Sequence, residues 1–292
     1  MKLVITGASG QLARGAAERV LKSAAPEDLI LATRTPAALT SFAARGVTVR
    51  RADFAEPQSL RTAFSGAERL LLVSATDLDR RTTQHRAALE AAKAAGVRHV
   101  VYTSGLKPEP PNPAVVAPSH HATEQALTQS GLAWTILRNS LYADYQLPEA
   151  QRAIETGELV HNRGTGLVAY VAREDCAAAA AAVLLQDGHD RAVYEITGHE
   201  RFAAHELATL YAELGGGLVQ ARALDDAAFI ATLVGNGTGD NHLRYGAELV
   251  ASFGRSIREG YMDSCTDAVA MLTGREPLAL RKVLAPLSLR TP

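Results

Sequence analysis

The chain has 292 residues, of which 47% are hydrophobic, and its formal net charge is −1. That apolar fraction can bury a substantial core, and the neutral balance gives no reason to expect nucleic acid or an anionic membrane as a partner. The two cysteines, Cys176 and Cys265, lie far apart and fit neither a disulfide framework nor a zinc site. No apolar run is long enough to span a bilayer, and the N-terminus lacks a signal-peptide pattern. We expect a soluble, cytoplasmic protein without a metal.

Short runs of strand type alternate with helical patterns through the first half of the chain. The strand-like runs cover residues 3–6, 29–32, 47–49, 70–73, 99–103 and 134–137. Apolar spacing and helix-start signals predict helices between them, near residues 12–21, 36–44, 57–64, 80–95 and 119–130. Several strands are apolar at every position, as expected when helices cover both faces of a sheet. The alternation predicts an α/β fold with a doubly wound parallel sheet.

The alternation becomes less regular after residue 140. Strand-like pieces occur at residues 159–161, 167–171 and 193–197, and an alanine-rich helix is expected at 174–186. From about residue 203 the pattern is mainly helical, and it contains a glycine-rich loop at 235–240. That loop is either a hinge over a site or an ordinary solvent-exposed loop.

The segment ITGASGQLARG, residues 5–15, joins the first strand to the first helix. Gly7 permits a sharp turn, and Ser9 and Gly10 are small enough for the backbone to approach a diphosphate. The helix that starts near Gln11 presents free N–H groups and the positive end of its dipole to the same place. Ala13 replaces a third glycine, and its methyl group still allows close packing. Because the motif lies inside a β-α-β unit, it predicts a dinucleotide cradle rather than a bare turn.

The end of the second strand bears on the choice of cofactor. No Asp or Glu occurs in residues 29–34 to bind a free ribose 2′-hydroxyl, whereas Arg34 offers a fork for a 2′-phosphate. This favours NADPH over NADH, unless Arg34 is only a solvated surface cation. Asp53 follows the third strand and is expected beside the adenine, with Phe54 packing there; the alternative is that Asp53 caps the helix that Pro57 opens.

Several longer motifs resemble one family. They are ITGASGQL at residues 5–12, RADF at 51–54, AKAAGVRHVVYTS at 92–104, LRNSLY at 137–142 and ELVHNRGTG at 158–166. Together they are similar to the NmrA-like branch of the atypical short-chain dehydrogenase/reductase family. Within that branch the chain most resembles bacterial triphenylmethane reductase and the related NAD(P)H:quinone oxidoreductase.

The resemblance implies a domain organisation and a set of cofactor contacts. It implies an NADP-binding Rossmann domain at residues 1–150, to which residues 173–200 return, and a smaller, mainly helical substrate-binding part at 151–292. The active site would lie in the cleft between them. The implied NADPH contacts are Thr6, Gly7, Ala8, Ser9, Gly10, Gln11, Leu12, Arg34, Asp53, Phe54, Ser74, Ala75, Gln84, Thr103 and Ser104.

One feature of ordinary short-chain dehydrogenases is missing. These enzymes carry Tyr-x-x-x-Lys on the helix after the fifth strand, where the lysine lowers the tyrosine pKa for proton exchange with substrate. Here that helix reads SHHATE at residues 119–124, so His120 and Glu124 take the two positions. Ordinary alcohol–ketone chemistry is therefore not expected. Hydride addition to a quinone, or to a cationic triarylmethane dye that becomes neutral, asks for less charge stabilisation.

Three side chains are candidates for the chemistry itself. His120 is a candidate proton donor or ribose contact, or else merely pairs with Glu124 on the helix face. Asn139 is a candidate partner for a carbonyl or for the nicotinamide carboxamide, or else a helix N-cap. Tyr142 is a candidate surface for stacking an aromatic acceptor, or else a core residue. Arg138 is expected to be a structural ion-pair partner, and residues 161–162 are candidates for the edge of the substrate pocket.

Three functions are compatible with this pattern. The first is NADPH-dependent reduction of quinone-like or triarylmethane-type electrophiles, with a small aromatic molecule as substrate and a homodimer as a possible assembly. The second is a non-catalytic NmrA-like sensor of NADP(H) that reports to a protein partner. The third, reduction of a carbon–carbon double bond, ranks lower because the lysine of such relatives is missing from the helix.

Overall fold

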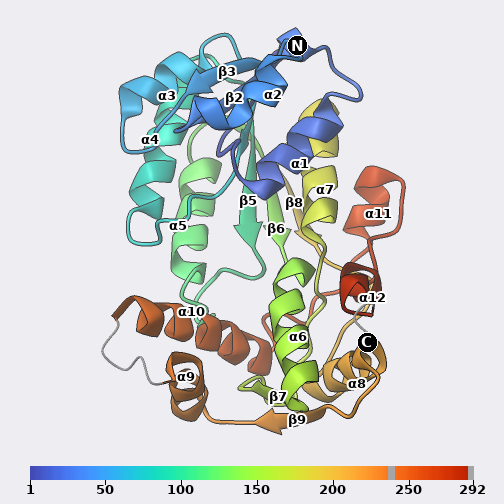
Figure 1. Ribbon diagram of the computed structural model, residues 1–292. Helices are drawn as coiled ribbons and strands as arrows, with labels where there is room; N and C mark the ends of the chain where they lie inside the picture. Colours follow the sequence, from blue (N-terminus) through green and yellow to red (C-terminus); the bar gives the residue numbers. More distant parts are fainter. Residues whose placement is uncertain (236–240, 289–292) are drawn as a thin grey trace.

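The computed structural model describes residues 1–235 and 241–288. Its centre is a seven-stranded sheet in the order β3-β2-β1-β4-β5-β6-β8, in which every neighbouring pair is parallel (Figure 1). The strands are β1 (Leu3–Ile5), β2 (Leu29–Thr33), β3 (Thr48–Arg51), β4 (Arg69–Leu72), β5 (His99–Gly105), β6 (Ala133–Asn139) and β8 (Ala192–Ile196). This confirms the predicted doubly wound sheet.

The two faces of the sheet bury two separate apolar clusters. Leu3 and Ile5 of β1 belong to one cluster and Val4 to the other, because successive side chains of a strand point to opposite faces. The first cluster is covered by α1 (Gln11–Val20), α7 (Arg173–Leu185) and α11 (Ala268–Thr273). The second is covered by α3 (Pro57–Phe64), α4 (Arg81–Ala94) and α5 (Ala117–Thr128). Burial on both sides explains why the strands are apolar at consecutive positions.

The strand order reverses beside β1, and this positions the site. Ile5 lies in register with Leu31 of β2 and with Leu71 of β4. The turns after these three strands therefore leave the sheet at one level. In an open parallel sheet, ligands bind in the crevice at the carboxyl ends of the strands where the order reverses.

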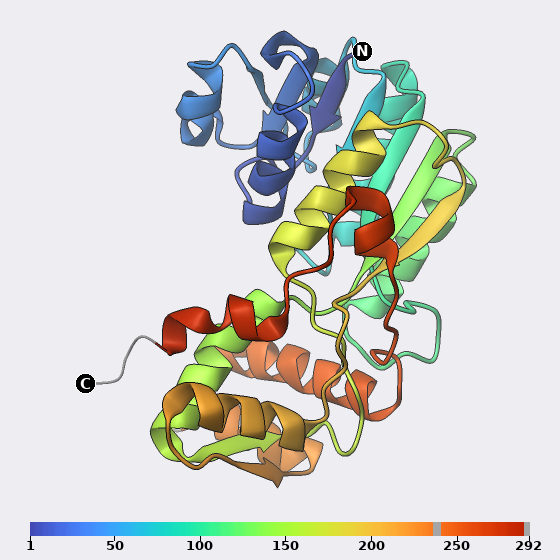
Figure 2. The same cartoon turned by 90° about the vertical axis from the view of Figure 1, so that its right-hand side faces the viewer.

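A third apolar cluster forms the lower part of the molecule in Figures 1 and 2. It lies among α6, α8, α10, α12 and a two-stranded parallel sheet of β7 and β9, with α9 packed against α10. The bounds are α6 (Gln146–Thr156), β7 (Glu158–His161), α8 (Ala204–Gly215), β9 (Gln220–Ala223), α9 (Asp226–Val234), α10 (Asn241–Arg258) and α12 (Leu280–Val283).

Two local expectations are corrected. Residues 167–171 do not form a strand: Val168 and Val171 make single bridges, to Phe202 and Tyr142, while the segment runs buried between the upper and lower parts. Its apolar run thus reflects burial rather than a sheet ladder. The helix expected at 36–44 is a 3₁₀ turn, Pro36–Leu39, followed by the short α2 (Thr40–Ala43).

The predicted loop at 235–240 lies outside the described residues apart from Gly235. The proposed division at residue 150 stays a prediction. The structure adds that α11 packs on α7 in the upper part, although it comes late in the chain (Figure 2). Among the described helices, none combines the length and the apolar character that crossing a membrane requires.

Candidate active site

The turn between β1 and α1 has an open backbone. Gly7 has a φ of +59°, in the left-handed region that favours glycine. Gly10 caps α1 without any side-chain hydrogen bond, and a Cβ added there would lie 3.2 Å from the carbonyl oxygen of Gly7. Arg14 is the first residue of the helix whose N–H reaches a backbone acceptor, the carbonyl of Gly10 at 2.9 Å. Among the described residues, the N–H groups of residues 11–13 therefore have no backbone partner and are available to an anion.

A second glycine of the same motif has a different task. A Cβ on Gly15 would lie 3.0 Å from the Cβ of Ala177, because α1 and α7 pack closely there. Ala13 is buried at the start of α1. The sequence pattern predicts the packing position at Ala13, whereas the structure places the closest approach of the two helices at Gly15.

The ends of β2 and β3 border this turn. Arg34 is exposed just after β2, and no carboxylate of the described residues pairs with it. The hydroxyl of Thr33 donates to Ser9 Oγ at 3.2 Å, which ties the strand end to the glycine turn. Asp53 Oδ1 accepts the N–H of Ala55 at 2.9 Å, so this carboxylate shapes its own turn before α3. The predicted roles of Arg34 and Asp53 toward the cofactor stay predictions.

The ends of β4 and β5 are joined by side chains of neighbouring strands. Thr6 Oγ1 accepts the N–H of Val73 at 3.0 Å, and Thr103 Oγ1 accepts the N–H of Ser74 at 3.0 Å. The N–H of Ala75 donates to a ring nitrogen of His85, which is fully buried in α4. Burial, helped by the positive charge of Arg81, lowers the pKa of His85 to about 3, so the ring is neutral. Sequence reasoning missed His85 because nothing in the sequence shows that it faces a strand end.

All the predicted cofactor residues lie along this carboxyl edge of the sheet. They occupy the turn and first residues of α1 (Thr6, Gly7, Ala8, Ser9, Gly10, Gln11, Leu12), the ends of β2 and β3 (Arg34, Asp53, Phe54), the segment after β4 (Ser74, Ala75), the first turns of α4 (Gln84) and the end of β5 (Thr103, Ser104).

His120 is buried and engaged with two neighbours. Its Nδ1 lies 2.8 Å from the hydroxyl of Tyr102, and its Nε2 lies 3.4 Å from Arg81 Nη1. A guanidinium can only donate, so Nε2 accepts and the ring proton sits on Nδ1. Burial first, and then the charge of Arg81 and the nearby His85, hold the pKa of His120 well below its usual value. This neutral ring does not favour His120 as a direct proton donor, a role that stays only a hypothesis.

The alternative pairing of His120 with Glu124 is not observed. Glu124 instead accepts from Ser104 Oγ at 2.6 Å and from two nitrogens of Arg138, at 2.6 and 3.1 Å. Arg138 also pairs with Glu109. Arg138 is therefore an ion-pair partner, as expected, and the network ties α5 to the ends of β5 and β6.

Asn139 and Tyr142 come together at the end of β6. Asn139 Nδ2 donates to the hydroxyl of Tyr142 at 3.4 Å, while Asn139 Oδ1 is sealed from solvent without a partner. Gln84 Oε1 is likewise buried without a hydrogen-bond partner. Unsatisfied buried acceptors are costly, so two of them at a ligand edge suit a ligand with N–H donors. The alternative that Asn139 is a helix N-cap is wrong, because it ends a strand and the next helical turn is capped by Tyr142.

Arg173 is a site residue that sequence reasoning missed. It opens α7 and lies over the rings of Tyr142 and Tyr145, 5.2 and 5.1 Å from their centroids. Its guanidinium also hydrogen-bonds to Gln11 and to Asp144. One arginine thus links the start of α1 to the aromatic side chains after β6. Only the fold brings these segments together.

The residues at 161–162 do not join this group. Asn162 donates to Asp226 and to the carbonyl of Ala251, both at 2.8 Å, and His161 accepts the N–H of Arg163. These partners all belong to the lower part of the molecule. The structure ties the two residues to the lower part by hydrogen bonds, and their place at the edge of a substrate pocket stays a prediction.

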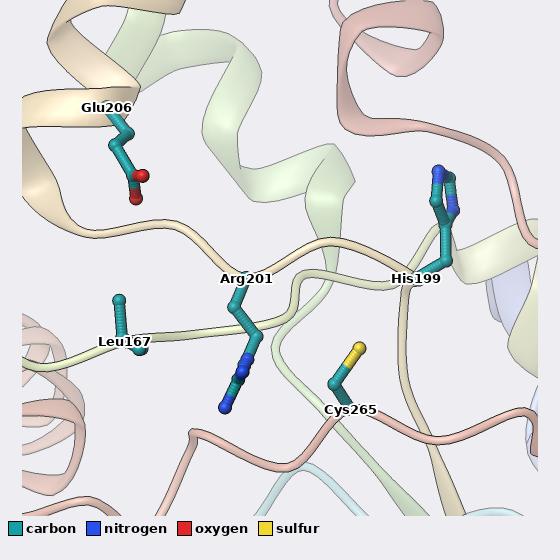
Figure 3. Close-up of a pocket in the computed structure, with 5 residues that line it drawn as sticks. All are labelled: Leu167, His199, Arg201, Glu206 and Cys265. Atoms are coloured by element: carbon teal, nitrogen blue, oxygen red, sulfur yellow. The ribbon is translucent and has the colours of Figure 1, made fainter.

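A surface cavity of about 640 Å³ lies elsewhere (Figure 3). Its five lining residues are Leu167, His199, Arg201, Glu206 and Cys265. None of them belongs to the predicted set. Leu167 comes from the segment between β7 and α7, Glu206 from the start of α8, and the other three from loops after β8. We therefore assign the chemistry to the strand ends, where the open backbone and the unpaired acceptors lie, and not to this cavity.

Comparison with known proteins also indicates a dinucleotide site at the carboxyl edge of the sheet. The model of a family described as NAD(P)H-binding matches residues 7–187, more than half of the chain, beginning at the glycine turn. The chain belongs to the NAD(P)H-binding family. The match begins just after β1 and ends just after α7, so it takes in β2 to β7 and the helix that carries Arg173.

Relatives of this NAD(P)H-binding protein are reductases. Quinone oxidoreductase 2 of Escherichia coli is 37% identical over 238 residues, which cover 82% of this chain and 83% of that one. The crystal structure of the NADPH-dependent quinone oxidoreductase of E. coli with NADPH superposes with a TM-score of 0.92, at 33% identity, over 98% of this chain and 99% of that one. Triphenylmethane reductase of Citrobacter sp. with NADP(H) gives 0.90, at 29% identity, over 98% and 100%. The predicted resemblance is confirmed, and the protein is an NAD(P)H-dependent oxidoreductase.

Proposed function

We propose that this oxidoreductase uses NADPH to transfer hydride to a quinone-like or cationic triarylmethane-type electrophile. The observation that carries the proposal is the combination of an open dinucleotide cradle with a neutral, buried His120 where ordinary short-chain dehydrogenases have their tyrosine. Such a site can bind and orient a hydride donor but offers no ready proton there. The names of the relatives, a quinone oxidoreductase and a triphenylmethane reductase, agree with acceptors of this kind.

The residues at the strand ends fit the cofactor. The free N–H groups of residues 11–13 suit the pyrophosphate, and the unpaired guanidinium of Arg34 suits a 2′-phosphate. Asn139 Oδ1 and Gln84 Oε1 are buried acceptors that the amide N–H groups of a carboxamide can satisfy. NADPH, when bound, supplies the hydride, and the protein orients its ring and excludes water.

Magnitudes favour acceptors that need little charge stabilisation. A ketone that accepts hydride becomes an alkoxide, whose conjugate acid has a pKa of roughly 16, near that of water. A quinone becomes a phenolate, whose conjugate acid has a pKa of about 10. The difference of about 6 units is roughly 8 kcal/mol that the site does not have to provide. A cationic triarylmethane dye becomes neutral and needs no proton.

The aromatic side chains after β6 supply a surface for a flat acceptor. Tyr145 is 64% exposed, and its ring lies 5.9 Å from that of Tyr142. Arg173 lies against both rings and holds them in place. An exposed tyrosine held in this way is suited to stacking on a small aromatic substrate. A homodimer and a cytoplasmic location stay predictions.

The test follows NADPH absorbance with a panel of benzoquinones, naphthoquinones and cationic triarylmethane dyes. We expect oxidation of NADPH with at least one class, and loss of this activity in Gly10→Val, in which the added side chain should block the cofactor. Calorimetry with NADPH runs in parallel. If the wild-type protein binds NADPH but oxidises it with no acceptor, the reductase proposal fails and the redox-sensor alternative takes its place.

A further inference from the structure

Arg81 is a buried cation at the same edge, and the functions described so far give it no role. It opens α4, and its side chain belongs to a residue that is only 6% exposed. Its Nε donates to the carbonyl of Ala75 at 2.6 Å, and its Nη1 lies 3.2 Å from Ser119 Oγ and 3.4 Å from His120 Nε2. All three acceptors are uncharged. Among the described residues, no carboxylate forms an ion pair with Arg81.

A buried, unpaired guanidinium is expensive. Removing an ion from water costs several kcal/mol, and a nearby opposite charge normally offsets this cost. Burial lowers the pKa of Arg81, but a guanidinium stays protonated at neutral pH. The protein thus maintains a positive charge without a counter-ion of its own at the ligand edge. A negative charge brought by a ligand would supply one.

The free end of the guanidinium has access to solvent. Nη2 donates to no group of the described residues. Unlike Gln84 Oε1, one turn further along α4, this unpartnered atom is not sealed from solvent. Two tyrosines lie within electrostatic reach of Arg81 and raise its pKa slightly against the effect of burial: Tyr102 in β5 and Tyr245 in α10. Tyr245 is 42% exposed, and α10 lies below the start of α5 in Figure 1. Nη2 is therefore open to solvent, on a side chain within electrostatic reach of α10.

Its neighbours fix the direction in which Arg81 points. Ala75 lies just after β4, and Ser119 and His120 lie in the first turn of α5, so contacts on two sides hold the guanidinium plane. His120 in turn is held by Tyr102, and its ring lies against Gly105 at the end of β5, 3.5 Å from where a Cβ would be. In this arrangement the neutral His120 positions Arg81.

We propose that Arg81 is a catalytic residue whose Nη2 donates to the acceptor oxygen that becomes negative as the acceptor is reduced. The proposal rests on the proposed function and deepens it, because it assigns the site to acceptors with a carbonyl oxygen, such as quinones. Bound NADPH would supply the hydride and become NADP⁺. The hydride would form an O–H bond at one quinone oxygen, its two electrons would leave the other oxygen negative beside Nη2, and the hydroquinone monoanion would take one proton from water. A preorganised donor aimed at developing charge is an effective catalytic device.

The first experiment needs no turnover. 4-Nitrophenol, whose phenolate is yellow, is titrated with pH in the presence of NADP⁺ and of wild-type protein, Arg81→Gln or Arg86→Gln. Arg86 is an exposed arginine of the same helix and serves as the matched control. We expect bound 4-nitrophenol to ionise more readily on wild type and Arg86→Gln, and Arg81→Gln to raise its pKa by about one unit, a tenfold change. Equal ionisation on all three proteins, or no binding to the wild type, would overturn the proposal.

The second experiment compares two substrate classes. Arg81→Gln should lower kcat for quinones on the order of 100-fold, as removal of an oxyanion donor does. Turnover of a cationic dye should be unchanged or faster, because no oxyanion forms and a repelling charge is gone. Equal losses for both classes would mean that Arg81 is structural. If wild-type protein turns over neither class, the proposed function fails, while the phenol titration still decides whether Arg81 binds an anionic oxygen.

Discussion

The two ends of the ligand edge are built in opposite ways. Around β1 and β2 the donors are left open: the first N–H groups of α1 have no backbone partner and Arg34 has no carboxylate. Around β5 and β6, by contrast, Glu124 is satisfied by Ser104 and Arg138. His120 there is held by Tyr102 and Arg81, while Asn139 Oδ1 remains a buried acceptor without a partner. The open end has binding capacity to spare, whereas the closed end is part of what holds the protein together. Changes at the open end should therefore alter affinity, and changes in the Glu124–Arg138 network of the closed end should alter stability.

The largest effect is expected at the closed end, from Glu124→Ala. The Glu124 side chain is 8% exposed and that of Arg138 is 15% exposed, so this ion pair is largely desolvated. Removing one partner of such a pair leaves an uncompensated charge, and we expect a loss of about 3 kcal/mol in the free energy of unfolding. Urea denaturation measures it. A loss below about 1 kcal/mol would show that Glu109 alone satisfies Arg138 and that this end is less closed than we describe.

Next comes Gly10→Val at the open end, compared with Gly15→Val five residues after the cap. A side chain at residue 10 blocks the approach of a pyrophosphate, so NADPH affinity should fall by about 100-fold or more, roughly 2.7 kcal/mol, with little change in melting temperature. A side chain at residue 15 would meet Ala177 and should cost about 1–3 kcal/mol of stability instead. Calorimetry and thermal melting separate the two. If both variants lose only NADPH affinity, or both lose only stability, the assigned roles of Gly10 and Gly15 are wrong.

A smaller effect is expected from Arg34→Ala. Because Arg34 is exposed and unpaired, its removal should leave stability unchanged. NADPH should bind about tenfold more weakly, as expected for the loss of a charge-assisted hydrogen bond, and NADH should bind as before. Titration with both coenzymes measures the ratio of affinities. An equal loss for NADPH and NADH would argue against a 2′-phosphate contact.

The smallest effect concerns acid stability and His85. Its pKa is about 3 in the folded protein and near 6.5 when unfolded. The unfolded state therefore binds the extra proton first, so the contribution of His85 is fully present above about pH 6.5 and is lost as the pH falls toward 3. Between about pH 7 and about pH 5.5 we expect a loss of about 1.3 kcal/mol from this residue. His85→Gln should flatten the pH profile by that amount in urea titrations; an identical profile would contradict the assignment.

The open end could be predicted from the sequence, and the closed end could not. The open glycine turn and the exposed Arg34 are local features, and their predicted roles follow from the order strand, turn, helix within a few residues. The apolar runs of the strands likewise predicted the parallel sheet. By contrast, Arg81 contacts Ser119 and His120 across 38 and 39 residues, and Arg173 reaches Gln11 across 162. No periodicity encodes such pairings, because they depend on which elements the completed fold brings together.

The same reason explains the expectations that the structure corrects. Residues 167–171 are as apolar as a strand, but burial between two parts of the protein produces the same composition as a ladder. His120 and Glu124 have the spacing of a helical pair, yet each finds a stronger partner on a neighbouring strand. Local spacing shows which side chains of one helix can contact each other, but the fold decides which contacts form.

The position of α11 on the main sheet affects any attempt to express part of this chain. Ala268, Val269 and Leu272 are buried in the same cluster as Leu3 and Ile5, at the opposite end of the sequence. A fragment that stops after β8 would carry every strand of the main sheet but would leave the apolar surface beneath α11 facing water. We expect such a fragment to aggregate on expression, and the missing segment, supplied as a separate peptide, to restore solubility by complementation.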